Sequence, residues 1–138
     1  MKTKILVSSL LILSMIFCLF ACNTVDKEGL WEDATYRRDT KLGKGSVVFY
    51  LEVKAGDDSI TFTIHTDKEM LGDALLEHDL IAGEESQYGL YVKKVNGIVA
   101  DYDVDGHYWA LQEDGEMLMT GVDSTPITDG AHYEFVYT

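Results

Sequence analysis

Aromatic side chains gather in the second half of the chain, where they could form a binding surface. The candidates for contact with a ligand are Tyr88, Tyr91, Tyr108 and Trp109. Rings of this kind bury a large area at a small cost in conformational entropy, which suits them to ligand contacts. Neighbouring residues of a strand point to opposite faces. Either Trp109 fills the core and Tyr108 is accessible, or Trp109 itself belongs to the binding surface.

Alternating carboxylates form a second candidate site, in this case for a cation. Asp101, Asp103 and Asp105 precede Gly106, a pattern typical of the first half of a calcium-binding loop. The second half departs from the pattern, because Gln112 stands where a bidentate glutamate is required. The segment therefore predicts either an acidic loop without a ligand or a weak Ca²⁺ site of the extracellular kind.

Catalytic residues do not form a recognisable motif in this sequence. His65, His78, His107 and His132 are scattered and show no paired metal-ligand spacing. Carboxylates are abundant, but their abundance does not identify an acid and base pair. We therefore expect a binding protein and not an enzyme, with the histidines at the surface or at the edge of the core.

A lipid anchor is predicted at the amino terminus. Lys2 and Lys4 precede an uncharged, apolar run over residues 5–21, which is typical of a signal peptide. The run ends in Leu19-Phe20-Ala21-Cys22, which resembles the bacterial lipobox, whose cysteine receives diacylglycerol before cleavage. We expect the mature chain to begin at Cys22 and to be held on the outer face of the bacterial cytoplasmic membrane. The alternative is an ordinary cleaved signal peptide followed by an incidental cysteine.

The mature chain would be acidic and would lack a disulfide. Cleavage before Cys22 removes Cys18 with the leader, and it also removes two lysines, which changes the net charge from −13 to −15. The 117 remaining residues must then rely on a hydrophobic core. A field of this sign repels nucleic acid and favours cations, basic partners or plain solubility. We expect a single domain and a monomer.

Two hydrophobic patterns mark the start of the folded domain. Residues 22–45 are polar, which predicts a tether, although Leu30 and Trp31 could dock on the domain. Alternating apolar residues over 47–53 and 60–64 flank a turn at 55–58, and this period of two predicts a β-hairpin.

One helix and several strands follow the hairpin. Helical spacing predicts a helix that begins after Asp67 and ends near Asp79, with a loop at 82–86 after it. Alternation and turn residues then predict strands over residues 89–95, 107–112, 117–120 and 132–137. Because the helix and the hairpin each have one apolar face to bury, we expect an α+β fold of the β-grasp kind over residues 46–138, with the helix across a mixed sheet.

Four stretches of the domain resemble a known family. They are Gly89–Val92 leading to Val95–Ile98; Tyr108-Trp109; Asp114-Gly115; and Gly121-Val122 followed by Ile127, Asp129-Gly130 and Phe135. In their order and spacing they are similar to a bacterial domain of unknown function that is related to the carboxy-terminal domain of transcobalamin and intrinsic factor. The resemblance implies a β-grasp-like fold and a relation to corrinoid binding. It also implies that Trp109 lies near the ligand.

Two functions follow as hypotheses. In the first, the domain captures a small molecule at the surface for uptake, and a corrinoid such as cobalamin is the first compound to test. In the second, the domain is a surface interaction or adhesion module without a small-molecule ligand, which meets a partner protein through a sheet edge or the aromatic face.

Overall fold

The computed structural model describes residues 29–138, and the predictions for the signal peptide and Cys22 lie outside the described residues. The predicted hairpin is confirmed as β2 (Val47–Ala55) and β3 (Asp58–Thr66), which pair in antiparallel register from Val47–Thr66 to Ala55–Asp58. Phe49, Leu51 and Val53 point to the core from β2, as their alternation predicts.

The strands form two sheets. A six-stranded mixed sheet has the order β1-β3-β2-β9-β7-β8, in which β1 (Thr40–Gly43) and β9 (His132–Tyr137) lie parallel to their neighbours β3 and β2. β7 (Trp109–Glu113) and β8 (Glu116–Met117) complete it. A three-stranded sheet joins β4 (Ile81–Ser86), β5 (Gly89–Val95) and β6 (Ile98–Val99).

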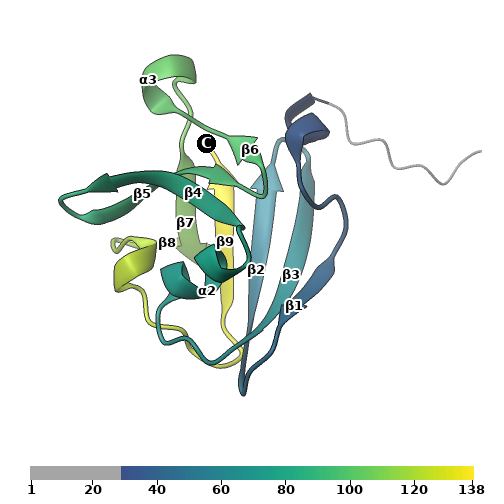
Figure 1. Ribbon diagram of the computed structural model, residues 1–138. Coiled ribbons are helices and arrows are strands. Elements are labelled where there is room, and N and C mark those ends of the chain that lie inside the picture. The colour runs from purple at the N-terminus through teal and green to yellow at the C-terminus, as the bar shows by residue number, and fades with distance from the viewer. Residues whose placement is uncertain (1–28) are drawn as a thin grey trace, which may run out of the picture.

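The core lies between the two sheets. The three-stranded sheet and helix α2 (Leu71–Glu77) lie over one face of the six-stranded sheet (Figure 1). Leu71, Ala74 and Leu75 of α2 are fully buried against this face, together with Phe62 and Phe135 of the large sheet. Burial of such side chains is the main stabilising contribution to a domain without a disulfide. This arrangement agrees with the predicted α+β class.

The folded domain begins before residue 46, where the tether was predicted to end. A short 3₁₀ helix, η1 (Gly29–Asp33), places Trp31 at 1% exposure, and the indole N–H of Trp31 donates a 2.9 Å hydrogen bond to the carbonyl of Ala55. β1 follows and extends the sheet beside β3. Residues 29–43 are thus part of the domain, because a polar segment can still contribute one large anchor and an edge strand.

Other differences concern residues 81–106 and 117–120. β4 occupies the predicted loop at 82–86, since pairing with β5 imposes an extended conformation on a sequence with low β-propensity. A one-turn helix, α3 (Tyr102–Asp105), and the two-residue β6 were not predicted. The strand predicted at 117–120 ends at Met117, because Leu118 makes the last backbone contact with β7 before the chain turns away.

None of the helices in the described part of the chain is both long enough and apolar enough to cross a membrane.

Candidate ligand-binding groove

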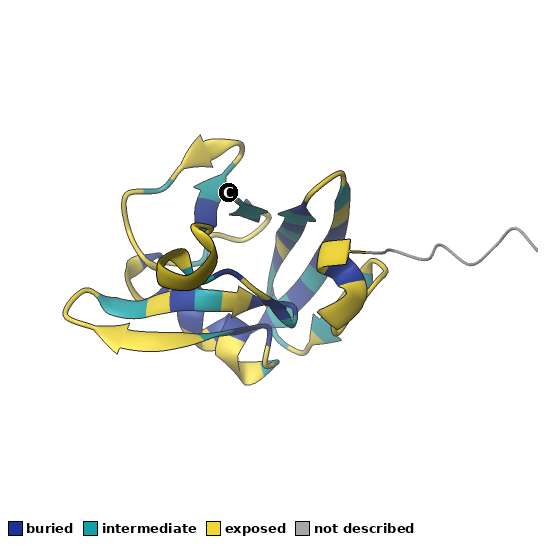
Figure 2. Ribbon diagram, turned by 90° about the horizontal axis from the view of Figure 1, so that it is seen from above, coloured by how far each residue is buried: buried dark blue, intermediate teal, exposed yellow. Residues whose placement is uncertain are grey.

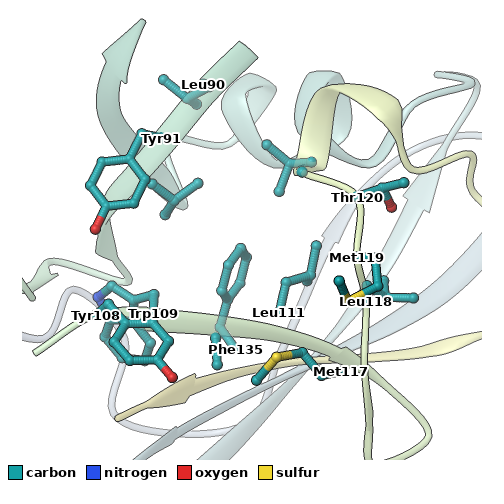
Figure 3. A pocket seen from close by; sticks show the side chains of 14 residues that line it. Leu90, Tyr91, Tyr108, Trp109, Leu111, Met117, Leu118, Met119, Thr120 and Phe135 are labelled. Carbon is teal, nitrogen blue, oxygen red and sulfur yellow. The ribbon is translucent and has the colours of Figure 1, made fainter. Parts of the chain in front are cut away.

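A groove of about 300 Å³ opens between the two sheets at their β5 and β7 sides (Figure 3). Residues from β5, from β7 and β8, from β9 and from the segment 118–122 line it. They are Leu90, Tyr91, Val92, Tyr108, Trp109, Ala110, Leu111, Met117, Leu118, Met119, Thr120, Gly121, Val122 and Phe135. The rings of Tyr91, Tyr108 and Trp109 lie at one end, and the side chains of 117–120 lie at the other (Figure 3).

Trp109 belongs both to the core and to the groove. It is 6% exposed, its indole N–H donates a 3.1 Å hydrogen bond to the carbonyl of Ile98, and its ring packs edge-on against Phe135 and Tyr137. These contacts hold the ring in one orientation, in which the side chain also lines the groove. Trp109 thus fills the core, as one interpretation of the sequence predicts, and it also lines the groove, while its contact with a ligand stays a prediction.

The other predicted aromatic residues divide into two groups. Tyr91 is 42% exposed and Tyr108 is half-buried, and both line the groove beside Trp109. Tyr88 is 83% exposed in the turn between β4 and β5 and does not line the groove. The structure thus brings together three of the four predicted ligand-binding residues.

The wall formed by residues 117–122 was not predicted to be part of a site. Met117 and Met119 are 57% and 95% exposed along this wall, and Leu118 between them is half-buried. A Met-x-Met spacing places two flexible apolar side chains on one side of an extended segment. That spacing was the signal in the sequence that could have pointed to this wall.

Thr125 and Asp123 lie outside the groove lining and hold two of its parts in place, the wall at 117–122 and the start of β5. The hydroxyl of Thr125 donates to the carbonyl of Gly121 at 2.8 Å and lies 2.9 Å from the hydroxyl of Thr120. The carboxylate of Asp123, on η2 (Val122–Ser124), accepts a 2.8 Å hydrogen bond from the backbone N–H of Leu90 at the start of β5. Segments that are separated by about thirty residues are thereby joined.

The groove is electrically neutral although the chain is strongly acidic. None of the described residues that line it is an aspartate, glutamate, lysine, arginine or histidine. The nearby ammonium group of Lys93 lies 5.8 Å from the centre of the Tyr91 ring and is paired with Glu84 at 3.2 Å and Asp101 at 3.5 Å. The hydrogen bond to Glu84 raises the pKa of Lys93, which keeps this amine charged and matched by carboxylates.

The three aspartates of the predicted calcium loop do not converge. Asp101 caps α3, since its carboxylate accepts from the N–H of Asp103 at 3.2 Å, and the carboxylate of Asp105 accepts from the N–H of His107 at 2.8 Å. Among residues 29–138 there is no group of three histidine, cysteine, aspartate or glutamate side chains that could hold a metal ion. These carboxylates instead make hydrogen bonds within a helical turn, and Ca²⁺ binding by them stays a prediction.

A charged cluster lies on the opposite face of the large sheet. Lys54 contacts both Glu134 and Glu52, and His132 lies 3.3 Å from Glu52. Glu134 is 4% exposed, and its carboxylate also accepts from the N–H of Gly115 at 2.7 Å. The hydrogen bond from Lys54, followed by that from Gly115, holds the pKa of Glu134 below its ordinary value, and the same contact raises the pKa of Lys54.

Comparison with known proteins gives one family and two similar structures of interest. The pattern of a domain of unknown function (DUF4430) matches residues 69–138. A proposed metal-binding protein from Ruminococcus gnavus ATCC 29149 is 31% identical, with a TM-score of 0.64, and the match covers 67% of this chain and 97% of that one. A search of the curated proteins found none that matches.

The second similar structure is haptocorrin in complex with Cbi. It is 22% identical with a TM-score of 0.52, and the match covers 70% of this chain. This chain spans about a quarter of that protein's length, since only 26% of haptocorrin is covered. The predicted resemblance to the transcobalamin family is confirmed at the level of the fold.

Proposed function

This chain belongs to the DUF4430 family, and from that premise we propose that its domain is an exported binding module whose groove holds one apolar face of a neutral small molecule. The observation that carries the proposal is the neutrality of the groove in an acidic chain. A ligand with a formal charge would find no opposite charge among the lining residues, whereas a flat apolar surface would find aromatic rings and thioethers.

The volume of the groove favours a ligand that is held along one edge. A cavity of about 300 Å³ lies at the lower end of small-molecule sites, and Tyr91 and Met119 at its rim are exposed. A large macrocycle could place its periphery between the rings and the methionine wall while the rest stayed outside. A corrinoid such as cobalamin is therefore the first compound to test, and the Cbi bound by haptocorrin supports this choice.

Binding without catalysis is part of the same proposal. The hydroxyl groups of the groove lining belong to Tyr91, Tyr108 and Thr120, and none of them has a histidine or carboxylate of the lining as a base. The metal-binding description of the Ruminococcus gnavus protein finds no counterpart among the described residues of this chain, where no cluster of metal-binding side chains is found.

The experiment is an equilibrium dialysis of the mature domain against cyanocobalamin, with two matched variants. Tyr91→Ala removes a half-exposed ring from the groove, and we expect affinity to fall roughly fivefold to thirtyfold, the range of a binding hot spot of about 1–2 kcal/mol. Tyr50→Ala removes a ring of similar exposure, 38%, from β2 outside the groove, and we expect affinity to stay within about twofold. Equal losses in both variants would contradict the groove as the binding site, and no binding at high micromolar cyanocobalamin would contradict the choice of a corrinoid as its ligand.

Export and lipidation of Cys22 complete the proposal. Mass spectrometry of the protein from membranes should find a first residue Cys22 that carries diacylglycerol, and Cys22→Ser should release the domain or leave the leader attached. A soluble wild-type chain with an unmodified cysteine would refute anchorage while leaving the groove untouched.

A protein-interaction module is the second candidate, favoured by the free edge of β4. Among residues 29–138, the order β4-β5-β6 leaves β4 without a neighbouring strand on one side, and its residues from Gly83 to Ser86 are exposed (Figure 2). Such an edge can accept an extended segment of a partner by strand addition. Cross-linking from photoreactive side chains placed at Glu85 should then capture a surface protein, whereas groove variants such as Tyr91→Ala should leave capture unchanged.

A further inference from the structure

The methionines of the described chain differ sharply in their surroundings. Met117 and Met119 are 57% and 95% exposed, and both line the groove. Met70 is half-buried, makes an isolated β-bridge with Pro126 and lies outside the groove lining. Figure 3 places the thioethers of Met117 and Met119 along the wall that faces Tyr91 and Trp109.

Exposed thioethers react with peroxides. A lone pair of the sulfur attacks one oxygen of hydrogen peroxide, and the sulfur–oxygen bond forms as the oxygen–oxygen bond breaks. The leaving hydroxide then takes the proton from the oxygen that is now bound to sulfur and departs as water. The sulfur is oxidised to a sulfoxide and the peroxide is reduced. The reaction needs access to the sulfur, which the structure gives to Met119 first, then to Met117, and least to Met70.

We propose that Met117 and Met119 form an oxidation site that controls the groove, so that hydrogen peroxide outside the cell weakens ligand binding until a sulfoxide reductase and a dithiol reduce the sulfoxides again. The proposal rests on the proposed function of the groove. A sulfoxide is a strong dipole with an acceptor oxygen, and the described lining of this groove has few polar side chains to pair with it. An apolar ligand would then have to desolvate this dipole without a partner, and such desolvation lowers affinity.

Leu118, between the two methionines, limits the effect of their oxidation to the groove surface. Leu118 lies between the two methionines, is half-buried and packs against the core, and its backbone N–H donates a 3.0 Å hydrogen bond to the carbonyl of Leu111. The backbone of the wall is therefore anchored to β7 independently of the thioethers. Oxidation should change the chemistry of the groove surface while the domain stays folded.

The test uses the mature domain, hydrogen peroxide and two ligands, the neutral apolar dye Nile red and cyanocobalamin. Peptide mapping at increasing peroxide should show a gain of one oxygen on Met119 and Met117 before Met70. Nile red affinity should fall roughly tenfold after this reaction, the effect of about 1.4 kcal/mol. Treatment with both stereospecific methionine sulfoxide reductases, with dithiothreitol as the reductant that is oxidised to its disulfide, should restore it.

Two variants make the outcome specific to the wall. In Met117→Leu/Met119→Leu, the ratio of dye affinities before and after peroxide should stay near one, and in Met70→Leu it should match the wild type. Equal oxidation rates at Met70 and the wall, or unchanged dye affinity after the wall is oxidised, would overturn this inference alone. Failure of both ligands to bind before oxidation would instead overturn the proposed function.

Discussion

Trp109 is the residue through which the core supports the groove. Its ring packs edge-on against two aromatic neighbours, and its indole N–H satisfies the carbonyl of Ile98, which joins β7 to β6. A residue held in this way keeps its groove edge in place before any ligand arrives, which lowers the ordering cost of binding.

We predict that Trp109→Phe lowers the free energy of unfolding by roughly 1–3 kcal/mol, because the carbonyl of Ile98 loses its donor in a buried place. Trp109→Ala should cost more, roughly 3–5 kcal/mol, because it also leaves a cavity. Urea denaturation followed by circular dichroism measures both values. The neighbouring Tyr108→Phe, which removes one hydroxyl from a half-buried ring, should stay within about 0.5 kcal/mol; an equal loss there would mean that the indole contact is not special.

Glu134 makes stability depend on pH. The pKa of Glu134 in the folded chain lies below its ordinary value of 4.5, so its contribution is fully present above that pH and is lost as pH falls through the lowered pKa. The raised pKa of Lys54 acts in the opposite range, since its contribution is present below its ordinary value of 10.5 and is lost as pH rises through the raised value.

We predict that Glu134→Gln is destabilised by roughly 1–2 kcal/mol at neutral pH and that this difference from the wild type shrinks below the ordinary pKa of the carboxyl group. The amide can still accept from Gly115 but cannot pair with the charge of Lys54. Urea denaturation at several pH values between about 3 and 7 measures the difference. A difference that stays constant over this range would show that the charge of Glu134 is not what stabilises the sheet.

Asp123 connects two elements that the groove needs. Its carboxylate accepts from the N–H of Leu90, and the Cα of Gly89, with φ of 95°, lies so close that an added Cβ would sit 2.7 Å from the same carboxylate oxygen. A side chain at position 89 would therefore be strained twice, once by the backbone and once by Asp123.

We predict that Asp123→Ala frees the N-terminal end of β5 and weakens ligand binding without unfolding the domain. Hydrogen exchange at the amide of Leu90 should become roughly tenfold faster or more, the effect of losing a hydrogen bond to a charged group of about 1.5 kcal/mol or more. The amide of Val95, at the far end of β5, should keep its protection in the same sample. Unchanged exchange at Leu90 would mean that other contacts hold this end of the strand.

At this scale the regular elements could be predicted and the irregular ones could not. The β2–β3 hairpin follows from strict alternation of large apolar residues. Helix α2 follows from helical spacing, although the helix is shorter than predicted. β4 carries Gly83 at a bulge, where an added Cβ would lie 1.8 Å from the carbonyl of Tyr91, so its extended form depends on the neighbouring strand. The position of the wall at 117–122 depends on Asp123, whose bond to Leu90 no local pattern reveals, and on Thr125, whose bond to Gly121 no hydrophobic period reveals.

The domain as a whole is completed by its N-terminal residues. Trp31 fills the end of the β2–β3 hairpin, and β1 covers the edge of β3. Nothing in the polar composition of residues 22–45 distinguishes this docked part from a tether. The sequence alone does not decide whether Trp31 docks, because a lone tryptophan in a polar segment fits both an exposed tether and a docked anchor.

We predict that a chain beginning at Ser46 is far less stable than one beginning at Gly29. Loss of a fully buried tryptophan costs roughly 3–5 kcal/mol, a large part of the 5–15 kcal/mol typical of a whole domain. Thermal denaturation of the two chains, with Trp31→Ala in the longer chain as a third sample, measures the effect. Equal melting temperatures for the two lengths would show that η1 and β1 are dispensable.

The docking of Trp31 also sets how far the domain can travel. With Cys22 acylated as proposed, the stretch between that cysteine and Gly29 can reach at most about 25 Å even when fully extended. The groove would then stay within this distance plus the width of the folded domain from the bilayer surface. Any membrane protein that accepts the ligand from the groove would have to bind it within the same distance, and lateral diffusion in the membrane would govern how often the two meet.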